Sequence, residues 1–116
     1  MSKFNLFSVL FVNFLAIGCA NKSLYYWGNY ESVVYKSFSK PGEMPSERQI
    51  EIFLADFERA QAANMAMPPG WHANLGVLYF ETGQLDLAHK QLTTEKKLFP
   101  ESKVFVDNLL KKLVKK

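Results

Sequence analysis

The strongest constraint on the fold is the spacing of small and apolar residues between Pro69 and Pro100. Gly76 and Ala88 are small enough to let two helices approach closely, and Gly83 can adopt the backbone of a tight turn between them. Pro100 cannot continue a helix, so the unit ends there. The pattern predicts an antiparallel helical hairpin whose interior is filled by Leu75, Tyr79, Leu85 and Leu92.

This spacing resembles one tetratricopeptide repeat, a two-helix unit that recurs in helical solenoids. The sequence departs from the repeat pattern at two positions. His72 stands where Trp is usual, with Trp71 one place earlier, and Glu95 replaces a customary small residue, which argues against close packing at that point. A lone repeat cannot bury both of its faces, so neighbouring helices are required.

The segment before this hairpin carries start and stop signals for two helices. Asn29 can cap a helix that runs to about Phe38. Ser46 begins a second helix, which the run Pro68-Pro69-Gly70 ends. Pro69 can then occupy the first turn of the third helix, the first of the hairpin, because its missing amide hydrogen is not needed there. The expected apolar face of the second helix is Ile50, Phe53, Leu54, Phe57 and Ala60.

After the third helix, a fourth is expected from about Leu85 to Phe99 and a fifth from near Ser102. No segment shows the sustained alternation of a half-buried strand. The sequence therefore predicts an all-α domain of tetratricopeptide-like helical hairpins, with about five helices over residues 29–116. The inward stripe of the fifth helix would be Val106, Leu109, Leu110 and Leu113.

The first residues have the organisation of a secretory signal. Lys3 gives a positively charged start, and an apolar run follows from Phe4 to Ile17. A bilayer-spanning helix needs about 20 apolar residues, so this run is too short to span and fits a signal instead. Cys19, the one cysteine of the chain, follows directly after Gly18.

The run from Leu15 to Cys19 resembles the lipobox of bacterial lipoproteins, with Ala16 where Leu is commoner. The resemblance implies a signal peptide over residues 1–18, cleavage after Gly18, and a lipidated cysteine and tether over residues 19–28. Several acyl chains on one cysteine would make a stable membrane anchor. Ala20, rather than Asp, directs such proteins to the outer membrane in enteric-type sorting. An uncleaved membrane helix and an ordinary signal with a free thiol remain alternatives.

Composition and motifs argue against several classes of function. A net charge of +3 does not call for a polyanionic partner, so we expect no nucleic-acid binding. The sequence lacks a nucleophile elbow, a phosphate loop and a zinc signature. His72 and His89 lie in different predicted helices with no cysteine or carboxylate at ligand spacing. We therefore expect no enzyme, no metal and no cofactor.

The resemblance to tetratricopeptide repeats implies a binding surface on the first helix of the hairpin. That surface would hold Asn74, Val77, Phe80 and Glu81, with Ala73 beside them. The amide of Asn74 can both donate and accept hydrogen bonds, as an anchor for a peptide backbone must. The alternative is that Asn74 only caps or bridges the local backbone.

Two further segments have competing interpretations. The aromatic cluster of Tyr25, Tyr26 and Trp27 can pack under the first helix, fill the groove of its own domain, or anchor a protein partner. The lysines at the C-terminus are typical of a solvated helix end, but they can also attract anionic lipid headgroups or cell wall. The lysines concerned are Lys111, Lys112, Lys115 and Lys116.

Three blocks of the mature chain together resemble a family of small bacterial lipoproteins known only as a domain of unknown function. The blocks are Tyr25-Tyr26-Trp27-Gly28-x-Tyr30-Glu31, then Pro68-Pro69-Gly70-x-His72-Ala73-x-Leu75-Gly76-x-Leu78-Tyr79, then Glu95-x-x-x-Phe99-Pro100-Glu101-Ser102. Members of that family are companions of two other kinds of lipoprotein, one similar to the curli secretion channel and one of putative periplasmic surface antigens. The resemblance implies a cell-envelope assembly and supplies no biochemical activity.

The functional hypothesis is an outer-membrane lipoprotein, facing the periplasm, whose helical domain binds other envelope lipoproteins. The alternative is a structural lipoprotein that meets cell wall or lipid through its basic C-terminal helix. An enzyme of unrecognised type is the third possibility.

Overall fold

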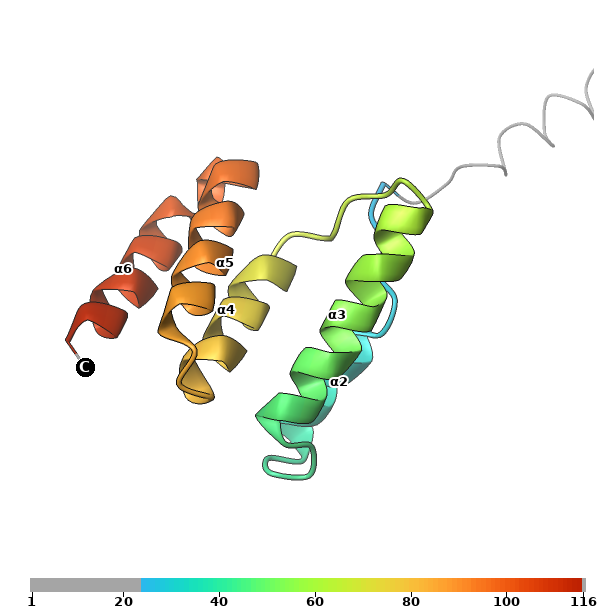
Figure 1. Cartoon of the computed structure of the whole chain (residues 1–116), viewed down its shortest axis with the longest axis horizontal. Helices are drawn as coiled ribbons and strands as arrows, with labels where there is room; N and C mark the ends of the chain where they lie inside the picture. Colours follow the sequence, from blue (N-terminus) through green and yellow to red (C-terminus); the bar gives the residue numbers. More distant parts are fainter. Residues whose placement is uncertain (1–23, 116) are drawn as a thin grey trace, which may run out of the picture.

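The predicted hairpin is present in the computed structural model, which describes residues 24–115. Helices α4 (Trp71–Glu81) and α5 (Leu85–Leu98) run antiparallel and are joined by a turn in which Gly83 has a φ of 79° (Figure 1). A Cβ atom on Gly76 would lie 2.9 Å from Cγ of Leu92, so only glycine allows this close approach. The prediction of a two-helix bend is confirmed, but Leu85 was wrongly assigned to its interior, since it is 44% exposed in the first turn of α5.

A second hairpin, of α2 (Tyr30–Ser39) and α3 (Ser46–Ala62), lies beside the first (Figure 1). Helix α3 ends at Ala62, before the run Pro68-Pro69-Gly70 that was expected to end it, and Asn64 then adopts a φ of 54°. Leu54 is 41% exposed and therefore lies outside the apolar face assigned to it. The next helix begins at Trp71 rather than at Pro69, because Gly70 adopts a left-handed backbone with a φ of 92° that belongs to the preceding loop.

The chain continues after α5 through a short 3-10 turn, η1 (Pro100–Ser102), into α6 (Lys103–Val114). Val106 of α6 packs with Ala73 and Leu92, so α6 covers the side of the α4–α5 hairpin that faces away from α3. Within residues 24–115 the regular structure is helical, with five α-helices and one isolated bridge between Tyr25 and Ala66. The all-α prediction is confirmed.

The main core lies where the two hairpins meet. Trp71 is 1% exposed and stacks on two rings of α3, with centroid distances of 5.6 Å to Phe53 and 5.7 Å to Phe57. His72 meets the same indole edge-on at 4.9 Å and places its Nδ1 atom 2.7 Å from Oε1 of Gln91. Both Trp71 and His72 are therefore packing residues.

A buried carboxylate holds the start of α2. Asp56 of α3 is fully buried and accepts hydrogen bonds from the backbone nitrogen of Asn29 at 2.7 Å and from its Nδ2 atom at 3.0 Å. Arg59 contributes a third contact at 3.2 Å. The side chain of Asn29 thus bonds to α3 and does not cap α2, contrary to the expected cap. Long-range hydrogen bonds between Asn29 and Asp56 thus replace the expected local cap.

Glu95 also has a role that its sequence position did not suggest. Its side chain is 2% exposed and points at the first turn of α4, where it accepts hydrogen bonds from Gly70 N at 2.7 Å and Ala73 N at 3.2 Å. The first amides of a helix have no partner within the helix, and its dipole favours a negative charge there. Glu95 is larger than the residue usual at this position of the repeat, but its carboxylate accepts hydrogen bonds from these amides. The two helices therefore still pack closely there.

The predicted signal peptide, Cys19 and most of the predicted tether lie outside the described residues. Among the helices of residues 24–115, none is long and apolar enough to cross a bilayer.

Candidate functional site

Two cavities open side by side along α4. One, of about 500 Å³, lies between α2, the loop that joins α2 to α3, α3 and α4. The other, of about 220 Å³, lies between α4, α5 and α6. Val77 and Glu81 line both cavities, so the two are continuous along one side of α4. We call this surface the α4 groove.

All four residues predicted on the first helix of the hairpin line this groove. Asn74 belongs to the larger cavity, Phe80 to the smaller, and Val77 and Glu81 to both. They share one side of the helix because they are spaced three or four residues apart. Ala73, by contrast, is 5% exposed and packs against α6 in the core.

Asn74 uses one end of its amide within the domain. Its Nδ2 atom donates to the hydroxyl oxygen of Tyr30 at 3.0 Å and to the carbonyl of Gly70 at 2.9 Å. Within residues 24–115, no hydrogen bond involves the Oδ1 atom of Asn74. The bond to Gly70 is the local backbone contact that the alternative interpretation expected, whereas the bond to Tyr30 joins the two hairpins. The oxygen remains as an acceptor at the larger cavity.

The groove carries charge of both signs at the end of α4. Glu81 is exposed and accepts a hydrogen bond from Ser46 Oγ at 2.7 Å. Lys112 of α6 lines the smaller cavity together with Glu81. Apolar side chains form most of the remaining wall, so the surface combines an apolar floor with polar groups at its edge.

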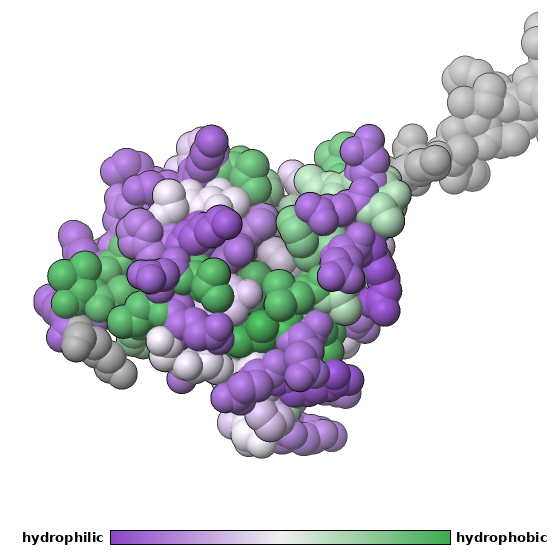
Figure 2. Space-filling model, viewed as in Figure 1, coloured by the Kyte–Doolittle hydropathy of each residue, from purple (hydrophilic) through white to green (hydrophobic). Residues whose placement is uncertain are grey.

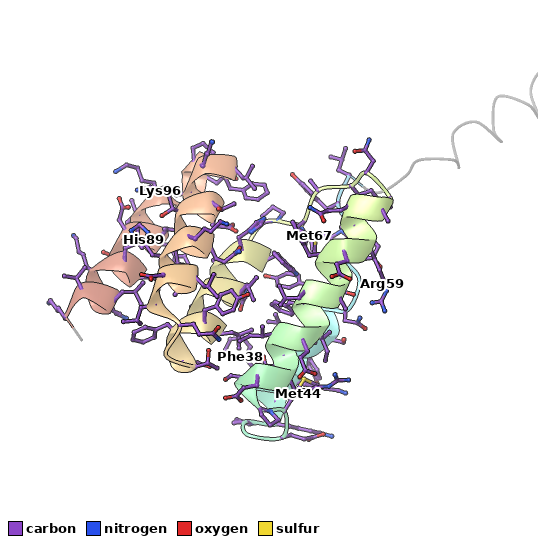
Figure 3. All side chains as sticks on the ribbon, in the orientation of Figure 1. Phe38, Met44, Arg59, Met67, His89 and Lys96 are labelled. Carbon is purple, nitrogen blue, oxygen red and sulfur yellow. The ribbon has the colours of Figure 1, made fainter. Side chains whose placement is uncertain are left out.

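Sequence reasoning missed the contributions of the helices that flank α4. Val34 and Phe38 of α2 line the larger cavity, and Leu109 of α6 lines the smaller. Helical spacing suggested that these residues point inward, but Phe38 is 80% exposed. It lies near the α2–α3 loop, at the same end of the hairpin as Met44 (Figure 3). The exposed aromatic ring at the cavity edge could not be distinguished from core by spacing alone.

The aromatic cluster near the start of the domain lines neither cavity. Tyr26 donates its backbone N–H to Ala66 at 2.8 Å, and the Tyr25 ring meets Phe99 edge-on at 6.1 Å. Trp27 lies 6.2 Å from the Tyr30 ring and keeps 39% of its surface exposed. Tyr25 and Tyr26 are half-buried packing residues at the end of the molecule opposite the α2–α3 loop.

Tyr30 sits at the junction of the hairpins, and burial raises the pKa of its hydroxyl above the ordinary value. The hydrogen bond from Asn74 opposes this rise in pKa, and the negative charge of Glu95 adds to it. The folded protein therefore retains the phenol proton to a higher pH than the unfolded chain does.

Because the pKa of Tyr30 is higher in the folded protein, its protonated hydroxyl stabilises the fold at every pH below the pKa of tyrosine in the unfolded chain. This contribution is lost as the pH rises through the pKa of the folded protein. We expect the free energy of unfolding to fall above about pH 10, and to fall less in Tyr30→Phe, which has no proton to lose. Urea denaturation of both proteins from about pH 8 to about pH 11 measures the difference. Parallel stability curves over that range would contradict the assignment.

The described residues provide no group of three or more histidine, cysteine, aspartate or glutamate side chains that could hold a metal ion. The α4 groove lies on an all-helical domain of two stacked hairpins and a closing helix. The chain belongs to the family of domain of unknown function DUF4810, whose model matches residues 24–109. No curated protein and no solved structure matches the chain.

Proposed function

We propose that this protein is a lipid-anchored binding module of the cell envelope that holds a segment of another protein in the α4 groove. The observation that carries the proposal is the pair of cavities that share Val77 and Glu81. The larger, of about 500 Å³, is in the size range of cavities that take ligands or the anchoring side chains of a peptide.

The lining of the groove supports a protein ligand. Apolar and aromatic side chains such as Phe38 and Phe80 can bury the anchors of a partner, and aromatic residues are enriched in protein interfaces. Glu81, Lys112 and the free oxygen of Asn74 can fix the orientation of a bound backbone. Binding on the first helix of a hairpin is also what a tetratricopeptide-like domain would use.

The anchor and the location rest on the sequence. The lipobox-like run that ends in Cys19 supports cleavage after Gly18 and acylation of the cysteine, and Ala20 supports retention in the outer membrane. We propose that the domain faces the periplasm and that its partners are other envelope lipoproteins, in particular one similar to the curli secretion channel.

The second candidate is a structural role through the basic C-terminal helix. Lys111, Lys112 and Lys115 are exposed, and within residues 24–115 no carboxylate lies at ion-pair distance from them. Their end of α6 is opposite the end at which residue 24 lies (Figure 1). That separation favours cell wall over the anchoring membrane as a target for these lysines.

The α4 groove is tested by a charge placed at its centre. Val77→Asp is expected to reduce capture of the curli-channel-like lipoprotein from detergent-solubilised membranes by at least about tenfold, or about 1.4 kcal/mol. The reason is that an uncompensated charge would be buried beneath the partner. Quantitative immunoblotting of the captured lipoprotein measures the effect.

The matched control is Leu54→Asp, which places the same charge on α3 at a side chain that is 41% exposed and lines neither cavity. Both variants should retain the thermal unfolding midpoint of the wild type within a few degrees. Equal capture by the two aspartate variants would reject the groove as the binding surface.

A further inference from the structure

Four of the exposed apolar side chains of the domain lie at or near the end where residue 24 lies, which we call the tether end; others, such as Phe38 and Val114, are exposed elsewhere. Leu24 is 83% exposed, Trp27 39% and Leu98, in the last turn of α5, 53%. Val104, at the start of α6, is 75% exposed. In Figure 2 hydrophobic side chains show at the upper edge of the molecule, beside residue 24 and over the end of α5.

Contacts between distant segments hold these residues at one end of the fold. The Tyr25 ring packs on Phe99 at a centroid distance of 6.1 Å, which joins the first described residues to the end of α5. Tyr26 N bonds to Ala66 O at 2.8 Å, which joins them to the loop between α3 and α4. Helix α5 ends and helix α6 begins at this end, whereas α2 begins beside the middle of α3 (Figure 1).

We propose that the tether end rests on the membrane surface, with Leu24, Trp27 and Leu98 in the lipid headgroup region. This inference rests on the proposed lipid anchor at Cys19. Leu24 follows Cys19 by five positions (24 − 19 = 5), and five residues span at most about 17 Å when fully extended. The anchor therefore keeps this end close to the bilayer.

Such a contact needs little affinity of its own. A short tether raises the effective concentration of the second contact to about the millimolar range, so a weak interfacial interaction becomes populated. Tryptophan and tyrosine favour the membrane–water interface because their rings are apolar and their N–H or O–H groups remain hydrated. Trp27 supplies such a ring here, beside the aliphatic Leu24 and Leu98.

The orientation would leave the α4 groove open to a partner. Glu81 lies at the far end of α4, and the 11 residues of that helix correspond to a length of roughly 16 Å. The α2–α3 loop and the exposed lysines of α6 are at the same far end. If the tether end contacts the membrane, the end of the α4 groove that holds Glu81 therefore faces away from the lipid.

Tryptophan quenching tests this contact because the two tryptophans differ in exposure. Trp27 is partly exposed at the tether end, whereas Trp71 is 1% exposed in the core. We expect the emission of the full lipidated protein, reconstituted in phosphatidylethanolamine vesicles, to fall as lipids brominated in the acyl chain replace ordinary ones. The decrease should be lost in Trp27→Phe.

The position control is Trp27→Phe combined with Phe38→Trp. This variant moves the reporter to a side chain that is 80% exposed at the opposite end of α2. It should show no quenching. Quenching of equal size from position 38, or none from Trp27 in vesicles that retain the protein, would overturn the inference while leaving the anchor intact.

Incorporation of radiolabelled palmitate into the wild type and into Cys19→Ser separates the two proposals. Labelling that depends on Cys19 supports the anchor whatever the quenching result is. Labelling that persists in Cys19→Ser, or is absent from the wild type, overturns the anchor and with it the inferred orientation.

Discussion

Trp71→Ala is expected to lower the free energy of unfolding by about 3–5 kcal/mol, the largest effect of a single substitution in this domain. The indole is 1% exposed and stacks against Phe53 and Phe57 of the other hairpin. Its removal leaves a cavity at the one place where the two hairpins share a core. Both hairpins should therefore unfold in a single transition at lower urea concentration.

Trp71→Phe and Trp27→Ala are the controls for this prediction. Phenylalanine keeps a ring between Phe53 and Phe57 and removes the indole nitrogen, which is buried without a hydrogen-bond partner among the described residues. We expect a loss of about 1–2 kcal/mol for that variant. For the partly exposed Trp27 we expect about 1 kcal/mol or less. Urea denaturation followed by circular dichroism gives all three values, and a small effect of Trp71→Ala would show that the hairpins do not depend on this contact.

Glu95→Ala is expected to lower the free energy of unfolding by about 2–4 kcal/mol, because it leaves buried backbone amides without a hydrogen-bond acceptor. The carboxylate accepts hydrogen bonds from Gly70 N and Ala73 N and complements the positive end of the α4 dipole. Glutamine keeps the shape and one acceptor oxygen but loses the charge, so Glu95→Gln should cost less than the alanine variant.

Amide hydrogen exchange identifies the cause of that loss. In Glu95→Ala the amides of Gly70 and Ala73 should exchange faster than those in the middle of α5, because they have lost their partner. Thr94→Ala is the matched control: the Thr94 hydroxyl bonds only to the carbonyl of Lys90 within the same helix, at 2.8 Å. If the first turn of α4 remains protected in Glu95→Ala, the carboxylate does not cap that helix.

The sequence predicted the hairpin of α4 and α5 well because its constraints are local. Gly76, Ala88 and Gly83 fix how closely the helices approach and where the chain turns, and each acts within one supersecondary unit. Asp56 and Glu95 were not foreseen in their roles. Each bonds to a backbone amide that is 22 or more positions away in sequence, so its use depends on how the hairpins stack.

The residues of the α4 groove also fall into those that the sequence could predict and those that it could not. Residues Asn74, Val77, Phe80 and Glu81 could be predicted together because helical periodicity alone puts them on one side of α4. The other walls come from α2, α3, α5 and α6, and the contribution of Phe38 or Lys112 follows only from the packing of separate helices. The aromatic residues near Tyr25 could not be assigned to core or surface from composition.

The most direct measurement of the central claim is site-specific photo-crosslinking in living cells. A photoreactive amino acid at position 77, in the middle of the α4 groove, should form a discrete adduct with an envelope lipoprotein. The same amino acid at position 54, exposed on α3, should not. Adducts of equal yield from both positions, or none from position 77 in cells that express the lipoprotein partners, would contradict a binding role for the groove.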